Sequence, residues 1–102
     1  MKLGFKTIDF METRTLEKLT TIEKETIEIE NIGSYVDKYG DKKVVFTTKD
    51  NSEKYFYMPD GFVKLFNDEM IEKINNNKET VKGYFEKIDL DNGRKCWNFT
   101  DM

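Results

Sequence analysis

The chain of 102 residues has no histidine and no alanine, and it has only one cysteine and one proline. Without histidine, a Ser-His-Asp triad cannot be built, and the commonest general base and metal ligand of proteins is missing. Cys96 cannot form an internal disulfide, which suits a reducing cytoplasm, and no histidine is present to activate it. We therefore expect a protein that is not an enzyme and needs no cofactor or metal.

Four aspartates are the strongest indication in favour of catalysis. Asp37 and Asp41 flank one predicted turn, and Asp89 and Asp91 flank another. A metal-dependent phosphodiesterase could use such a set, but aspartates solvated in turns are far more common.

Long apolar runs and an excess of basic residues are also missing. No run approaches the ~20 apolar residues that cross a bilayer, and the first residues lack the apolar core of a signal peptide. Seventeen Lys and Arg oppose 20 Asp and Glu, for a formal net charge of -3. A protein that coats nucleic acid by bulk charge alone is normally basic. We expect one cytoplasmic domain, residues 1–102, with no membrane partner.

The hydrophobic pattern predicts a mostly β domain that begins with three strands. Residues 1–24 are a lead-in segment, read as irregular or as a short helix over residues 12–22. In ETIEIENIGSYV, Ile27 and Ile29 alternate with glutamates, and the alternation slips by one residue just before Gly33. This slip indicates a first strand that bends at a β-bulge. The segments KKVVFTTK and KYFYMP form the next two strands, after turns at KYGD and KDNS.

One helix and a hairpin complete the predicted order. Five large apolar side chains between Phe62 and Ile74 recur at helical spacing within residues 60–77, and Asp60 is placed to cap this helix. Asn92-Gly93 then predicts a turn between two final strands. The order β-β-β-α-β-β is that of the OB-fold, a five-stranded Greek-key barrel, here over residues 25–100. The alternative is an open α+β sheet with one packed helix.

Basic and aromatic residues lie where such a barrel would gather them. OB-folds bind on the face of strands two and three, between the loops that join strands one and two and strands four and five. Single-stranded nucleic acid is held there by aromatic rings that stack on bases and by basic side chains. We expect Tyr55 and Tyr57 on the outer face, Phe56 and Met58 in the core, and Trp97 with Phe99 in the core. The basic candidates in the two loops are Lys38, Lys42, Lys43, Arg94 and Lys95.

The coincidence of these residues on one predicted face carries the hypothesis, since each of them alone is ordinary. Tyrosines are common on strand faces, and lysines are common in turns. The first loop also lies in residues 33–58, the only net-positive segment, with five basic and four acidic side chains. We therefore predict a protein that binds single-stranded nucleic acid.

Several segments resemble a known family. KYGDKKVVFTTKD, the tyrosine-rich KYFYMP, the amphipathic helix and NGRKCWNF are similar to the small OB-fold single-stranded-DNA-binding proteins of bacteriophages and mobile elements. The resemblance covers roughly residues 25–100 and implies a role in DNA replication or recombination, contact with proteins of those pathways, no cofactor and self-association. By position it adds Tyr39 to the candidates named above.

The negative charge supports a second hypothesis. An acidic OB-fold module, or a small phage or plasmid regulator, could dock a partner protein through the same face with tyrosines as anchors. The stretch EKETIEIE would then favour a basic partner.

Overall fold

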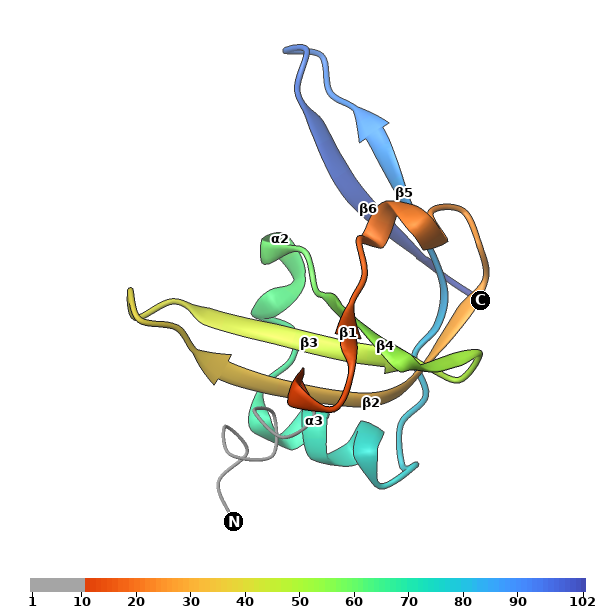
Figure 1. Cartoon of the computed structure of the whole chain (residues 1–102). Helices are drawn as coiled ribbons and strands as arrows, with labels where there is room; N and C mark the ends of the chain where they lie inside the picture. The colour runs from red at the N-terminus through yellow and green to blue at the C-terminus, as the bar shows by residue number, and fades with distance from the viewer. Residues whose placement is uncertain (1–10) are drawn as a thin grey trace.

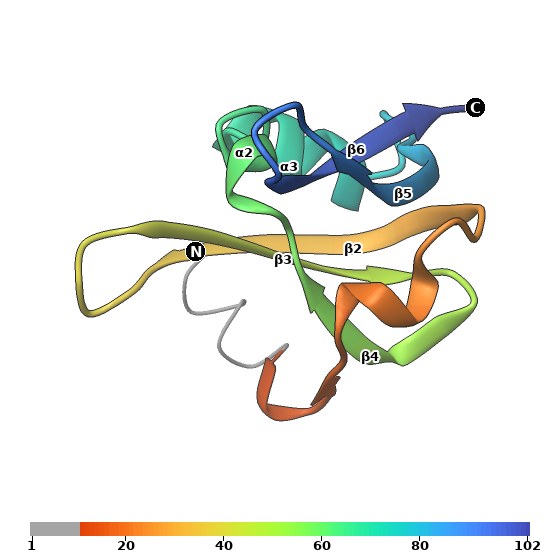
Figure 2. The same cartoon turned by 90° about the horizontal axis from the view of Figure 1, so that it is seen from above.

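The computed structural model describes residues 11–102, which form a six-stranded sheet with short helices packed against it (Figures 1 and 2). The elements are β1 (Thr15–Leu16), the 3-10 helix η1 (Leu19–Ile22), β2 (Ile27–Val36), β3 (Lys42–Thr48), β4 (Asn51–Tyr57), α2 (Asp60–Val63), α3 (Asp68–Asn75), β5 (Lys82–Asp89) and β6 (Lys95–Asp101). The strand order is β1-β4-β3-β2-β5-β6. Strands β2 to β6 pair antiparallel, and β1 pairs parallel with β4.

Strand β2 is bent and shared between two halves of the sheet, as its sequence predicts. Ile27 pairs with Gly83 of β5, whereas residues beyond the bend pair with β3, for example Gly33 with Val45. The register shifts between Ile29 and Asn31, where the alternation of the sequence slips. The bend lets the two halves face each other across one core.

The core joins both halves of the sheet to the helices. Phe46 of β3 is fully buried, and its ring stacks on Phe56 of β4 at 5.5 Å and on Phe85 of β5 at 5.9 Å between ring centroids. The predicted inward orientation of Phe56 and Met58 is confirmed, since both are buried. Burying a side chain of this size contributes roughly 1.5–3 kcal/mol, so these few aromatics dominate the stability of a small domain.

The mostly β architecture is confirmed, but the sheet is open. It ends at β1 on one side and at β6 on the other, as in the predicted open α+β alternative. The predicted count of five strands is wrong, because Thr15 and Leu16 of the lead-in add a short strand beside Lys54 and Tyr55. The helix considered over residues 12–22 is replaced by this strand and by η1.

The prediction of one helix over residues 60–77 is also wrong. The side chain of Asn67 accepts a hydrogen bond from the Met70 N–H at 2.8 Å and thereby starts α3 as a separate helix. Asp60 lies in the first turn of α2 and does not cap it, since Pro59 occupies the cap position. Neither α2 nor α3 is long and apolar enough to cross a membrane.

Candidate functional site

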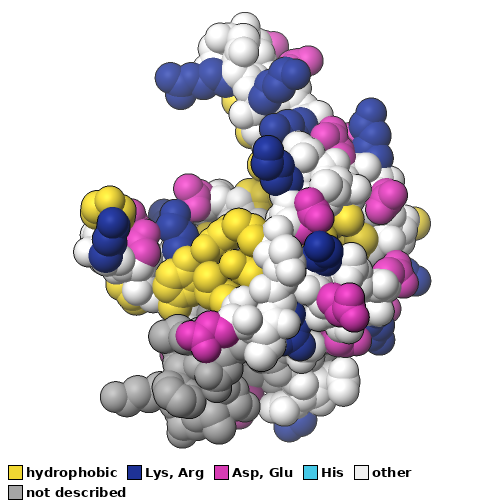
Figure 3. Space-filling view, in the orientation of Figure 1, with side chains coloured by type: hydrophobic (Ala, Val, Ile, Leu, Met, Phe, Trp, Pro, Cys, Tyr) yellow, Lys and Arg dark blue, Asp and Glu magenta, His cyan; other side chains and the backbone are white. Residues whose placement is uncertain are grey.

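Two arms project from the core and enclose a concave face (Figure 1). The platform arm comprises the ends of β2 and β3 and residues 37–41 between them; the hairpin arm comprises β5, β6 and residues 90–94. Figure 3 shows hydrophobic side chains gathered in the angle between the arms, with Lys and Arg side chains over the hairpin arm. Hydrophobic and basic side chains therefore lie close together on this face.

A groove of about 430 Å³ lies beside the hairpin arm. Its walls come from residues 16–20 of the lead-in, from residues 57–60 at the end of β4, and from Lys87 and Trp97 of the hairpin arm. Three segments that are distant in the sequence therefore build one groove, which offers both aromatic rings and basic side chains. We call it the groove below.

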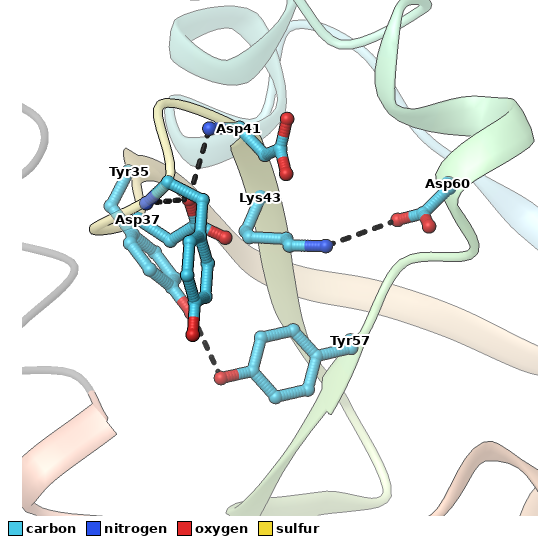
Figure 4. A network of polar contacts seen from close by, with 7 residues as sticks. Tyr35, Asp37, Asp41, Lys43, Tyr57 and Asp60 are labelled. Carbon is cyan, nitrogen blue, oxygen red and sulfur yellow. Dashed lines mark hydrogen bonds and ion pairs between the residues drawn. The ribbon is translucent and has the colours of Figure 1, made fainter.

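Tyr57 forms one aromatic wall of the groove and is held in place by Tyr35. The two hydroxyl oxygens are 2.9 Å apart (Figure 4), and Tyr57 remains 36% exposed. Tyr35 pairs with Lys43 of β3, and Tyr57 pairs with Val45 of the same strand. Lys43 and Val45 are two residues apart and so lie on one face of the sheet, which places Tyr35 and Tyr57 on that face as well. Partial burial, followed by the hydrogen bond to Tyr57, raises the pKa of Tyr35 above its ordinary value.

Tyr55 lies on the same face as Tyr57 but is not open to solvent. Its ring meets that of Tyr57 edge-on at 6.1 Å between centroids, and only 8% of the residue is exposed. Leu16 of β1 pairs beside it, and the Glu17 N–H donates to its carbonyl at 2.9 Å. The predicted outward orientation is correct, but the expectation that this ring can stack on a base is wrong, because Tyr55 is buried. Desolvation by burial, and then the charge of Tyr57, raise its pKa.

Lys42 and Lys43 lie on opposite faces of β3, as strand geometry requires. Lys43 is on the face that carries Tyr57, with its Nζ 3.5 Å from Oδ1 of Asp60 (Figure 4). The Nζ of Lys42 donates to the carbonyl of Phe66, on the helix side, at 2.8 Å. Of the two predicted lysines, only Lys43 therefore stands beside the groove.

Lys38 and Tyr39 lie at the tip of the platform arm, away from the groove. The turn is fixed by Asp37, whose Oδ1 accepts from the Tyr39 and Asp41 N–H groups at 2.9 Å each. Gly40 has a φ of 84°, as the turn prediction requires. Tyr39 is 76% exposed, with the Lys38 ammonium 5.1 Å from its ring centroid.

Arg94 and Lys95 lie at the tip of the other arm. Both are exposed, and the Arg94 N–H donates to Oδ1 of Asn92 at 3.0 Å within the predicted Asn-Gly turn. Gly93 has a φ of 80°, which confirms the turn. Basic residues therefore lie at the tips of both arms, which point away from each other (Figure 1).

The sequence prediction missed the pair that forms the second wall of the groove. Lys87 and Trp97 are directly opposite in the β5–β6 ladder, and the Lys87 Nζ lies 5.1 Å from the Trp97 ring centroid. Trp97 is only partly buried and meets Phe85 edge-on at 6.3 Å, so it is not wholly a core residue as predicted. The predicted two-residue turn at Asn92-Gly93 would have paired Trp97 with Ile88. In the structure the turn is longer, with the Leu90 N–H donating to the Arg94 carbonyl at 2.7 Å, and this shifts the register so that Trp97 faces Lys87.

The lining of the groove is balanced in charge although the chain is acidic. Lys18 and Lys87 line it together with Glu17 and Asp60. Each carboxylate has a further lysine nearby: Lys54 is 4.0 Å from Glu17, and Lys43 is 3.5 Å from Asp60. Glu23, which accepts from the Lys87 N–H, is a third carboxylate at this place, so four lysines stand near three carboxylates, whereas the whole chain has a net charge of -3.

The four turn aspartates do not form a metal site. Asp37 and Asp41 lie at the tip of the platform arm, whereas Asp89 and Asp91 lie at the end of the hairpin arm (Figure 1). Within residues 11–102, no group of three or more acidic, Cys or His side chains could hold a metal ion. The chemistry that this face offers is therefore that of rings, ammonium groups and two carboxylates.

Comparisons of the chain with protein-family models, with curated proteins and with solved structures find no match. The resemblance to phage single-stranded-DNA-binding proteins thus stays a prediction from sequence.

Proposed function

We propose that the protein binds single-stranded nucleic acid, DNA in the first instance, in the groove beside its hairpin arm. The observation that carries this proposal is the groove itself, where the exposed ring of Tyr57 and the ring of Trp97 lie beside Lys18 and Lys87. Rings that stack on bases and ammonium groups that follow phosphates are the two elements of single-strand binding.

Individual basic side chains support the proposal, although this face has no net positive charge. Lys18 and Lys87 at the groove, and Lys38, Arg94 and Lys95 at the arm tips, can each contact a phosphate, while acidic side chains at the same places balance their charge. The Lys87 ammonium, which lies over Trp97, can turn to a phosphate and leave the ring to a base. Lys87 would then cover the Trp97 ring in the free protein and contact a phosphate in the bound protein.

The OB-type barrel belongs to this proposal. The order β4-β3-β2-β5-β6 is that of a barrel opened between β4 and β6, and the groove lies between the end of β4 and Trp97 of β6. A role in phage-like replication or recombination, with partner proteins of those pathways, follows from the same resemblance.

The acidic protein-interaction module is the weaker hypothesis. Of the four glutamates in the stretch EKETIEIE, three are already used within the chain. Glu23 accepts from the Lys87 N–H, Glu28 pairs with Lys49, and Glu30 accepts from the side chain of Asn31. Only the Glu28–Lys49 contact pairs a glutamate of this stretch with a cation, so it lowers the charge left for a basic partner by one, while the hydrogen bonds of Glu23 and Glu30 restrict their side chains.

The test is a titration of a labelled oligothymidine, about ten nucleotides long, followed by fluorescence anisotropy at several salt concentrations. If about three phosphates are neutralised, the logarithm of the association constant should fall with the logarithm of salt with a slope of about -2. Absence of binding at low salt would remove this function and favour the protein-interaction module.

Two substitutions locate the site in the same assay. Tyr57→Ala and Trp97→Ala should each weaken binding about tenfold, since stacking contributes about 1–3 kcal/mol per base. Tyr84→Ala is the matched control, because Tyr84 pairs with Thr100 and lies on the opposite face of β5 from Phe85. Tyr55 is unsuitable, since its truncation would damage packing. Equal effects of all three substitutions would place the site elsewhere.

A further inference from the structure

The groove has acceptor groups as well as ammonium groups, and these bear on which base it prefers. Asp60 and Glu17 present carboxylates from the two walls that flank Tyr57. An ionised carboxylate only accepts hydrogen bonds. A base edge that enters between these walls therefore meets acceptors, in addition to lysines that the phosphates attract.

Of the two carboxylates, Asp60 is better placed to accept hydrogen bonds from a base. Its side chain is 85% exposed, against 34% for Glu17. Oδ1 of Asp60 lies 3.5 Å from the Lys43 Nζ, which is longer than an ordinary hydrogen bond, so this contact is loose. Within residues 11–102, no hydrogen bond occupies Oδ2 of Asp60, whereas Oε1 of Glu17 accepts from the Lys18 N–H at 3.2 Å.

Lys43 also reduces the repulsion between Asp60 and the phosphates of a bound strand. A lone carboxylate repels phosphates, but the Lys43 ammonium compensates the charge of Asp60 where it stands (Figure 4). The carboxylate can then act as a local hydrogen-bond acceptor without making the groove negative.

We propose that the groove prefers guanine, with Asp60 as the residue that determines this specificity. This inference rests on the proposed function. The Watson–Crick edge of guanine has two adjacent donors, N1–H and N2–H₂, which match the two oxygens of a carboxylate. Cytosine offers only its N4–H₂ group. Thymine and uracil offer one donor, N3–H, between two carbonyl oxygens that repel the carboxylate, so they match it less well than guanine does.

The test compares oligothymidines of about ten nucleotides that carry one central guanine, one central cytosine or neither. The wild-type protein should bind the guanine strand about tenfold more tightly than oligothymidine, with the cytosine strand between them, as expected for one bidentate contact. Asp60→Asn should reduce this ratio to about one, because the uncharged amide has one acceptor oxygen and can no longer accept from both donors of guanine. Asp50→Asn is the matched control, since Asp50 is exposed in the turn between β3 and β4 and carries the same charge.

The outcomes separate the two proposals. If none of the strands binds, the proposed function fails. If all three bind equally, or if Asp60→Asn keeps the guanine preference, the function stands and this inference is overturned. Guanosine monophosphate serves as competitor and should displace the guanine strand only weakly, since it cannot reach the arms. Strong competition would indicate a site for free nucleotides and would overturn the assignment to a strand.

Discussion

The two arms are built alike at their tips but differently at their roots. Each tip is a short turn with a glycine at positive φ, Gly40 in the platform arm and Gly93 in the hairpin arm. The platform arm continues into the fully buried part of β3, with β4 on one side and β2 on the other. The hairpin arm is joined to the rest of the sheet by two residue pairs, Ile27 with Gly83 and Glu28 with Lys82.

This difference suggests that one wall of the groove is rigid and the other is mobile. Beyond Gly83, strands β5 and β6 pair with each other, and their main anchor in the core is Phe85, which packs on Phe46 of β3 and Phe62 of α2. The carbonyl of Phe85 also accepts from the Lys24 N–H at 2.7 Å. A hairpin with so few partners opens or tilts more easily than a strand inside a sheet. We expect the platform to hold Tyr57 in a fixed position and the hairpin arm to bring Trp97 and Lys87 onto a ligand.

The largest effect is expected at the root of the hairpin arm. A Cβ at Gly83 would lie 2.0 Å from the carbonyl oxygen of Thr100, so Gly83→Ala must push β6 away from β5. We expect a loss of about 3 kcal/mol in the free energy of unfolding, measured in urea. Gly40→Ala and Gly93→Ala meet no atom within 4 Å and should each cost about 1 kcal/mol, through strain at positive φ alone. Equal losses at all three glycines would contradict the contrast between root and tips.

A smaller effect is expected on the platform side at alkaline pH. The pKa values of Tyr35 and Tyr55 are raised in the folded protein from the ordinary value of 10.0, chiefly by burial, so the folded state holds these protons more tightly. The stability that results is fully present below the ordinary pKa and is lost as the pH rises through the folded-state values. The unfolding free energy should therefore fall above about pH 10, and less so in Tyr35→Phe. An unchanged pH profile in that variant would show that the titration of Tyr35 does not cause the loss of stability.

The sequence predicted the local features of this fold because local chemistry determines them. Glycine at positive φ, the slip beside Gly33 and the alternation of Tyr55 with Phe56 each follow from two or three neighbouring residues. The break between α2 and α3 was missed because Asn67 acts as a cap within an unbroken hydrophobic period.

The parts of the groove that depend on distant contacts could not be predicted. The residues around Leu16 do not predict that it pairs beside Tyr55, since a strand of two residues is too short to show a pattern. That pairing buries one predicted tyrosine. The wall made by Lys87 and Trp97 depends on how the hairpin arm folds back toward β4, which is a property of the whole sheet.

The most direct test of the groove as the binding site is the fluorescence of Trp97, the only tryptophan of the chain. Addition of single-stranded DNA should change this emission in proportion to binding, because a base that stacks on the ring replaces the Lys87 ammonium. Added salt should reverse the change. Binding that is seen by anisotropy while the emission of Trp97 stays constant would contradict the account, since the strand would then lie away from the groove.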